Sequence, residues 1–131
     1  MAKMIHTMIR VFDLSQSIKF YGQALQLSVQ QQCDFDDFSL VYLANAENNF
    51  ELELTYNTAR STPYSHGSGY GHLAVSVEDI NASHAALLAM GLMPGEIKVF
   101  HHQGEILAKF FFISDPDGYQ IEFIETGGRY H

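Results

Sequence analysis

The chain of 131 residues has one cysteine, three prolines, no tryptophan and only seven lysine and arginine residues. The lone Cys33 excludes an intrachain disulfide and the cysteine-rich zinc patterns, and it favours a reducing cytoplasmic location. Fifteen acidic residues give a formal net charge of −8, so we expect no nucleic-acid partner, because nucleic-acid phosphates would be repelled. No apolar run reaches the length of a membrane span, and MAKMIH leads directly into a predicted strand, which predicts no signal peptide and no membrane partner.

What the sequence does contain is a repeated histidine that is followed seven residues later by an aspartate. The first copy, HTMIRVFDL, begins at His6, and the second copy, HLAVSVEDI, begins at His72. Each copy leads to a short apolar strand with a central glutamate, which is Glu53 in the first half and Glu122 in the second. The chain is therefore predicted to be a duplication in which each module carries one histidine and one glutamate.

The length and the hydrophobic content of 47% suit a single compact domain with an adequate core. We expect this domain to consist of two repeats, with module 1 at residues 4–58, a linker rich in small and polar residues at 59–70, and module 2 at 71–126. Each module is predicted to have the order βαβββ, which gives an α+β fold.

Apolar periodicity and turn signals place the elements of these modules. One helix is expected from Asp13 or Ser15 to about Leu25, and another from near Asp79 to a stop at Gly91. DPDG at 115–118 predicts the last hairpin turn, and the third strand of the first module has the weakest pattern. The apolar stripe of the first helix is predicted to be Leu14, Ile18, Tyr21 and Leu25. Strands are predicted at 5–11, 38–44, 50–56, 71–77, 97–101, 107–113 and 119–125.

Strand alternation predicts where the repeated histidines and glutamates point. Leu52 and Leu54 flank Glu53 and face the helix that packs on the sheet, which leaves Glu53 on the opposite face. The same argument applies to the other three side chains, those of His6, His72 and Glu122. All four residues are thus expected on the faces away from the helices.

Four such side chains at repeat-equivalent positions predict a shared metal site, because a carboxylate that is removed from water needs a cation or a metal beside it. Imidazole and carboxylate ligands suit nickel, cobalt, zinc, manganese or iron. Two nitrogen and two oxygen donors leave coordination positions open for water or substrate, which is typical of a catalytic site.

At these residues the chain resembles the glyoxalase I (lactoylglutathione lyase) family of the vicinal oxygen chelate superfamily. The passages that carry the resemblance are HTMIRVFDLSQSIKFY, ELTYN, GYGHLAVSVED and DPDGYQIEFIE. The resemblance implies tandem βαβββ modules with helices outside curved mixed sheets. It also implies one divalent metal per site, with nickel or cobalt favoured, zinc possible and no organic cofactor. The implied metal ligands are His6, Glu53, His72 and Glu122.

The resemblance further implies methylglyoxal detoxification. The hemithioacetal of methylglyoxal and glutathione would become S-lactoylglutathione by proton transfer through a metal-bound enediolate, with Glu122 as the main base and Glu53 acting from the other side. Arg10 and Asn57 match positions that contact glutathione. The family also implies a homodimer in which each site is built from one module of each chain. The motifs do not fix which basic residue binds the glycine carboxylate of glutathione, and Lys98, Lys109 and Arg129 are candidates.

Other activities of the same scaffold remain alternatives. An acyl-CoA epimerase tends to carry glutamine in place of Glu53, whereas ring-cleaving dioxygenases and thiol transferases use two histidines and one glutamate. A non-catalytic protein that binds a small molecule and confers resistance generally lacks the four-ligand set. The presence of Glu53 therefore favours the lyase over these alternatives.

Overall fold

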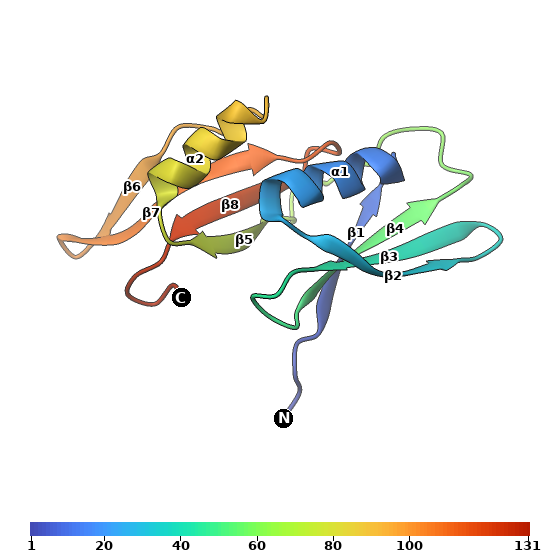
Figure 1. The fold of residues 1–131 in the computed structure, drawn as a ribbon, viewed down its shortest axis with the longest axis horizontal. Helices are drawn as coiled ribbons and strands as arrows, with labels where there is room; N and C mark the ends of the chain where they lie inside the picture. Colours follow the sequence, from blue (N-terminus) through green and yellow to red (C-terminus); the bar gives the residue numbers. More distant parts are fainter. The chain divides into compact units, whose positions relative to one another are not determined.

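The computed structural model describes residues 1–131 and divides the chain into two compact units, Met1–Ser65 and His66–His131 (Figure 1). Each unit contains one α-helix and one four-stranded mixed sheet. The predicted α+β class and the βαβββ order of each repeat are confirmed.

The first unit places its first and last strands side by side. The strand order is β1-β4-β3-β2, in which β1 pairs parallel with β4 and the other neighbours are antiparallel. A residue at the start of the repeat thereby lies next to one near its end. The elements in chain order are β1 (His6–Val11), α1 (Leu14–Leu25), β2 (Ser28–Asp34), β3 (Phe38–Ala44) and β4 (Glu51–Asn57).

The second unit has the same topology. Its strand order is β5-β8-β7-β6, with β5 parallel to β8 and the remaining pairs antiparallel. The elements are β5 (His72–Val77), α2 (Ile80–Ala89), β6 (Lys98–His102), β7 (Glu105–Ser114) and β8 (Gln120–Glu125).

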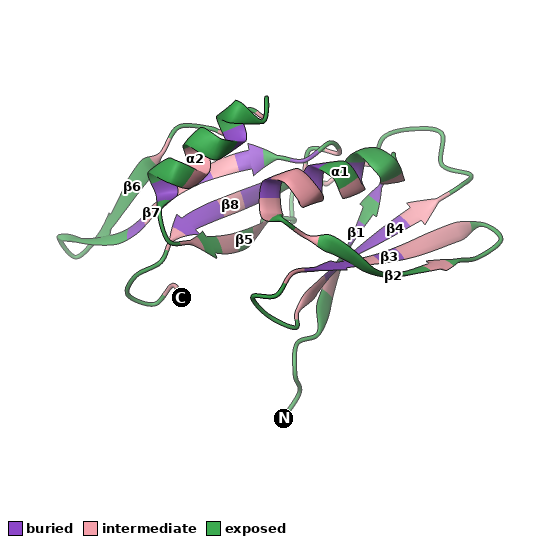
Figure 2. Cartoon of the chain, viewed as in Figure 1, coloured by how far each residue is buried: buried purple, intermediate pink, exposed green.

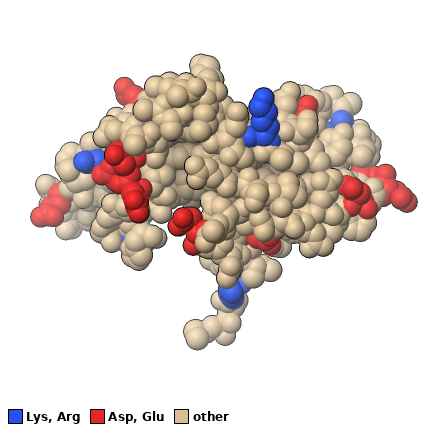
Figure 3. Space-filling view, in the orientation of Figure 1, with Lys and Arg blue, Asp and Glu red and all other residues tan.

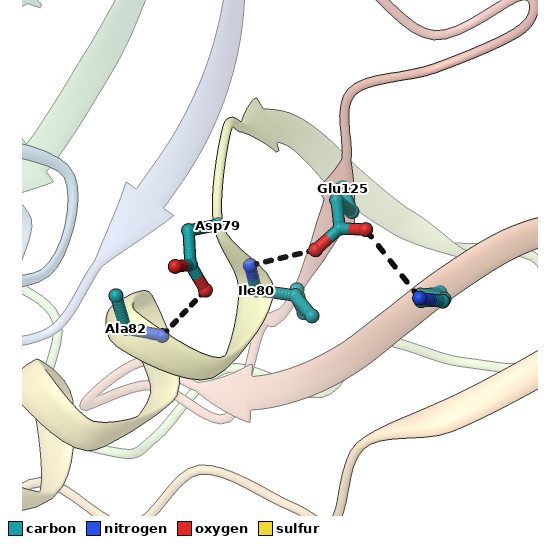
Figure 4. A network of polar contacts seen from close by, with 5 residues as sticks. Asp79, Ile80, Ala82 and Glu125 are labelled. Atoms are coloured by element: carbon teal, nitrogen blue, oxygen red, sulfur yellow. Dashed lines mark hydrogen bonds and ion pairs between the residues drawn. The ribbon is translucent and has the colours of Figure 1, made fainter.

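The aspartate of the repeated motif caps the helix in both units. Oδ1 of Asp13 accepts the N–H of Gln16 at 3.0 Å, and Oδ1 of Asp79 accepts the N–H of Ala82 at 2.9 Å (Figure 4). Each bond satisfies an N–H that has no partner within the helix. The bond from Gln16, followed by that from the Ser15 hydroxyl, holds the pKa of Asp13 below its usual value. The spacing from histidine to aspartate thus corresponds to one strand followed by one helix cap.

Alternating residues of the central strands form the core of each unit (Figure 2). Buried apolar side chains come from every second position, as a sheet with one covered face requires. In the first unit they include Ile9, Val11, Val41, Leu43, Leu52 and Leu54, and in the second Phe111, Ile113, Ile121 and Phe123.

The predicted stripe of α1 was wrong in its orientation. Of its four residues only Tyr21 is buried, and the other three are half-buried. Phe20 packs edge-to-face on Tyr21 with ring centroids 5.1 Å apart, and the buried face of the helix follows these two rings. The buried side chains of α1 are Ser17, Phe20, Tyr21 and Ala24.

Strand β2 was not located from the sequence. Its residues SVQQQCD are almost all exposed, and neither face is apolar. It is a strand because it forms the antiparallel edge beside β3, with a register shift between Val29 and Gln31. Backbone pairing, rather than an apolar face, defines this element.

The predicted DPDG turn is confirmed. Oδ1 of Asp115 accepts the N–H groups of Asp117 and Tyr119, both at 2.9 Å, and Gly118 has a positive φ of 86°. Positive φ is the conformation that glycine adopts without a steric penalty. The turn therefore connects β7 to β8 with its polar groups paired.

His66 is half-buried and packs on this turn. Its ring stacks on Tyr119 with centroids 4.2 Å apart and planes at 4°, and Tyr70 meets both rings edge-on. The His66 Nε2 atom is buried without a hydrogen-bond partner. Burial, and then the negative charge of Asp115, raise the pKa of Tyr70.

Charged side chains are sparse on the face shown in Figure 3. The acidic side chains form small groups there, whereas the basic ones stand singly. Neither α-helix has the length and hydropathy that a membrane-spanning helix requires.

Candidate metal and substrate site

The parallel pairing of β1 with β4 brings His6 and Glu53 together on one face of the first sheet. Glu53 lies opposite Met8 in the register, and Met8 shares its face with His6. Nε2 of His6 is 3.1 Å from Oε2 of Glu53. The Glu53 side chain is 11% exposed and that of His6 is 37% exposed, so the carboxylate is largely removed from water and the imidazole is accessible.

The second unit repeats this arrangement with His72 and Glu122. The pairing of β5 with β8 sets Glu122 opposite Ala74, which shares a face with His72. Nε2 of His72 lies 2.9 Å from Oε2 of Glu122, whose side chain is 15% exposed. The two units therefore contain equivalent His–Glu pairs.

Each pair lies on the sheet face opposite the buried apolar side chains that flank its glutamate. Leu52 and Leu54 are buried on either side of Glu53, and Ile121 and Phe123 are buried on either side of Glu122. In the second unit the opposite face carries α2, because Phe111 makes an edge-to-face contact with His84 of that helix. Both glutamate side chains thus point to the face opposite these apolar residues, as strand alternation predicted.

The structure brings the four predicted ligands together as two pairs. The chain contains no group of three or more His, Cys, Asp or Glu side chains placed to bind one metal ion. Each pair supplies one imidazole nitrogen and one carboxylate oxygen, which is half of the predicted donor set.

The geometry of each pair fits two adjacent positions around a divalent cation. Donor atoms about 2.1 Å from one ion and at right angles to each other are about 3 Å apart. The observed separations of 3.1 Å and 2.9 Å match this value. The donor chemistry, nitrogen from imidazole and oxygen from carboxylate, also suits such a metal.

The two pairs differ in one neighbour. Tyr42 of β3 lies opposite Glu53 in the antiparallel register, and Phe112 of β7 lies opposite Glu122. Each ring makes an edge contact with the histidine of its own unit, at 6.2 Å for Tyr42 with His6 and 5.2 Å for Phe112 with His72. We did not single out Tyr42 from the sequence, because alternation along 38–44 groups it with the apolar residues Phe38, Leu40 and Ala44.

Arg10 and Asn57 lie on the same sheet face as the first pair. Arg10 is two residues beyond Met8 on β1, and Asn57 is four residues beyond Glu53 on β4. Oδ1 of Asn57 accepts a hydrogen bond from the Tyr64 hydroxyl at 3.2 Å. This bond orients the Asn57 amide at the end of β4, on the sheet face that carries His6 and Glu53.

The three basic candidates occupy different surroundings. Lys98 of β6 lies opposite Phe110 of β7, so their side chains are on the same sheet face. Phe110 shares this face with Phe112, which lies opposite Glu122. Lys98 is therefore on the face that carries Glu122. Lys109 points to the other face, where its Nζ lies 3.8 Å from Oε1 of Glu125.

Glu125 also accepts the N–H of Ile80 at 3.1 Å, so Lys109 belongs to the contacts at the start of α2. Arg129 lies beyond the last strand, with its guanidinium 5.9 Å from the ring of Tyr130. Of the three, Lys98 alone is on a strand face that also carries a His–Glu pair.

Comparison with known proteins matches residues 3–123 to the Glyoxalase/Bleomycin resistance protein/Dioxygenase superfamily. A protein of Haemophilus influenzae named lactoylglutathione lyase is 38% identical over 129 residues, which cover 95% of this chain and 93% of that protein. A probable lactoylglutathione lyase of Synechocystis is 34% identical over 134 residues, covering 96% and 97% of the two chains.

Solved structures of glyoxalase I are also similar to this chain. The trypanothione-dependent glyoxalase I of Leishmania major is similar with a TM-score of 0.75 and 37% identity, over 95% of this chain and 87% of that one. Glyoxalase I of Zea mays has a TM-score of 0.83 and 27% identity, over 96% of this chain and 45% of the maize chain.

Proposed function

The chain belongs to the Glyoxalase/Bleomycin resistance protein/Dioxygenase superfamily, and we propose that it is a metal-dependent lactoylglutathione lyase that detoxifies methylglyoxal. The observation that carries this proposal is the presence of two equivalent His–Glu pairs, at 3.1 Å and 2.9 Å, in a chain 38% identical to a lactoylglutathione lyase. Relatives that use three ligands would not require a second glutamate.

We propose that His6, Glu53, His72 and Glu122 bind one divalent ion, with nickel or cobalt preferred and zinc as the next choice. The support is the donor set and the spacing of each pair. When bound, such an ion stabilises negative charge that develops on the oxygens of the substrate, which is worth several kcal/mol.

Glu122 is the proposed base. Its carboxylate would take the proton from the carbon that bears the hydroxyl and sulfur, and return it to the neighbouring carbon. The side chain is 15% exposed and lies opposite Phe112, so few water molecules compete for the carboxylate. Glu53 is proposed to act from the other side of the substrate.

Arg10, Asn57 and Lys98 are proposed to bind the thiol carrier. The guanidinium and the ammonium would pair with its carboxylates, and the Asn57 amide would bind its peptide groups. One similar structure is that of a trypanothione-dependent glyoxalase I, so the thiol carrier has to be identified separately from the reaction. Glutathione is the proposed carrier.

We further propose that the protein is a cytoplasmic homodimer in which each site combines module 1 of one chain with module 2 of its partner, each chain being a single domain of two repeats. Each unit alone supplies half of the donors. β6 and β7 also expose apolar side chains, which commonly mark a contact surface: Val99, Phe100, Ile106 and Leu107.

Metal reconstitution tests the reaction. The protein is stripped with a chelator, reloaded separately with nickel, cobalt or zinc, and assayed for S-lactoylglutathione from methylglyoxal and glutathione. We expect turnover to return with nickel or cobalt. Metal binding without turnover by any of the three would contradict the lyase proposal.

Complementation tests the shared site. One variant loses both ligands of module 1, His6→Ala with Glu53→Ala, and the other loses both ligands of module 2, His72→Ala with Glu122→Ala. A mixed dimer would contain one complete site, so the mixture should regain activity that neither variant has. An inactive mixture in which mixed dimers are demonstrated would contradict a site between chains.

A further inference from the structure

The duplicated modules differ chemically at the residue that lies opposite each glutamate. Tyr42 and Phe112 occupy equivalent register positions on β3 and β7, and each ring meets the histidine of its own pair. The difference between them is one hydroxyl group. Only Glu53 therefore has a hydrogen-bond donor at this position.

Tyr42 of β3 lies opposite Glu53 in the antiparallel register with β4, on the sheet face that carries His6 and Glu53. Burial raises the pKa of Tyr42, the negative charge of Glu53 raises it further, and a side-chain hydrogen bond to Glu53 contributes in the same direction. The Tyr42 hydroxyl is therefore the hydrogen-bond donor that the register places beside the Glu53 carboxylate. A carboxylate that accepts a hydrogen bond from a neighbouring hydroxyl has less freedom to rotate.

We propose that Tyr42 is the positioning residue that makes Glu53 a fixed metal ligand, whereas Phe112 leaves Glu122 free to move a proton. This inference rests on the proposed function, since it assigns different tasks to two glutamates of one site. It explains how a duplicated ligand pair performs two tasks: the module with the hydroxyl holds its carboxylate in place, and the module without it keeps a carboxylate available as the base.

Two single substitutions that change one oxygen atom test the inference. Tyr42→Phe removes the donor beside Glu53, and we expect nickel affinity, measured by calorimetry on the metal-free protein, to fall about tenfold or more. Phe112→Tyr places a donor beside Glu122, and we expect nickel affinity no lower than in the parent while kcat falls about tenfold or more.

The matched control is Tyr56→Phe. Tyr56 lies on β4 on the other face from Glu53, so loss of its hydroxyl should leave nickel affinity unchanged. Thermal unfolding of the metal-free variants shows whether each one is folded. A purely structural role of Tyr42 would lower the unfolding temperature of the metal-free protein without the opposite effects expected for the two main variants.

The outcomes separate this inference from the proposed function. A parent protein that binds no nickel would overturn the metal site and the inference with it. A parent that binds nickel, with Tyr42→Phe indistinguishable from Tyr56→Phe, would overturn the inference alone. An unchanged kcat in Phe112→Tyr would also contradict it, because a donor beside Glu122 would then have no effect on the base.

Discussion

Nε2 of His72 and Oε2 of Glu122 lie 2.9 Å apart on neighbouring parallel strands of the second sheet. The first sheet reproduces this contact between its own histidine and glutamate at 3.1 Å. The first and last strands of each unit are neighbours, so the histidine that starts the repeat meets the glutamate near its end. Duplication of the module therefore duplicates the His–Glu pair.

Glu122→Gln should retain the fold and lose most of the activity. Glutamine has nearly the same shape but cannot accept the substrate proton, so we expect kcat to fall by about 10²- to 10⁴-fold. Glu105→Gln, at an exposed position of β7, is the matched control and should keep the parental rate. Near-parental turnover in Glu122→Gln would exclude this residue as the base.

Lys98→Ala should raise KM for the hemithioacetal, whereas Lys109→Ala should not. Lys98 lies on the face that carries Glu122, but the ammonium of Lys109 is beside Glu125 on the other face. Loss of a hydrogen bond between charged groups predicts an increase in KM of about tenfold or more. Steady-state kinetics with both variants checks this, and an equal increase in the two would contradict the assignment.

Asp79→Ala should destabilise the protein without changing the site. The substitution removes the acceptor of the Ala82 N–H, and the loss of a helix cap costs about 1 kcal/mol in the free energy of unfolding. Urea denaturation measures this cost. Asp79→Ser keeps a capping oxygen and should recover most of the loss, while Glu78→Ala, at the exposed preceding residue, should have little effect.

His66→Phe should be at least as stable as the parent. Phenylalanine preserves the ring that stacks on Tyr119 and removes the buried Nε2 atom, which has no hydrogen-bond partner. His66→Ala loses the stacking contact and should lower the free energy of unfolding by about 1 kcal/mol. If denaturant unfolding ranked His66→Phe below His66→Ala, the stacked ring would not be the stabilising element.

The sequence predicted most of the fold because alternation and capping are local properties. The apolar neighbours of Glu53 defined both a strand and the direction of the carboxylate, and Asp13 marked the start of a helix. Strand β2 has no such pattern, since the residues SVQQQCD are polar on both faces and form a strand only through pairing with β3. The packing of His66 depended on a contact with Tyr119, more than fifty residues away in the chain.

The candidate site was predictable only in its parts. Repeat-equivalent positions identified two histidines and two glutamates, and their pairing followed from strand order. Tyr42 was not singled out because one aromatic residue on a strand is usually a packing residue, and its position opposite Glu53 depends on the strand register. The proposed sharing of one ion by the two pairs would depend on how the modules combine, which strand patterns do not encode.

The stoichiometry of bound nickel tests most directly whether the two His–Glu pairs share one ion. Calorimetry and metal analysis of the parent should give one nickel ion per chain, and loss of either pair, through His6→Ala with Glu53→Ala or through His72→Ala with Glu122→Ala, should abolish tight binding. Two ions per chain in the parent, with one retained in each double variant, would show that the pairs bind metal independently and would contradict the shared site.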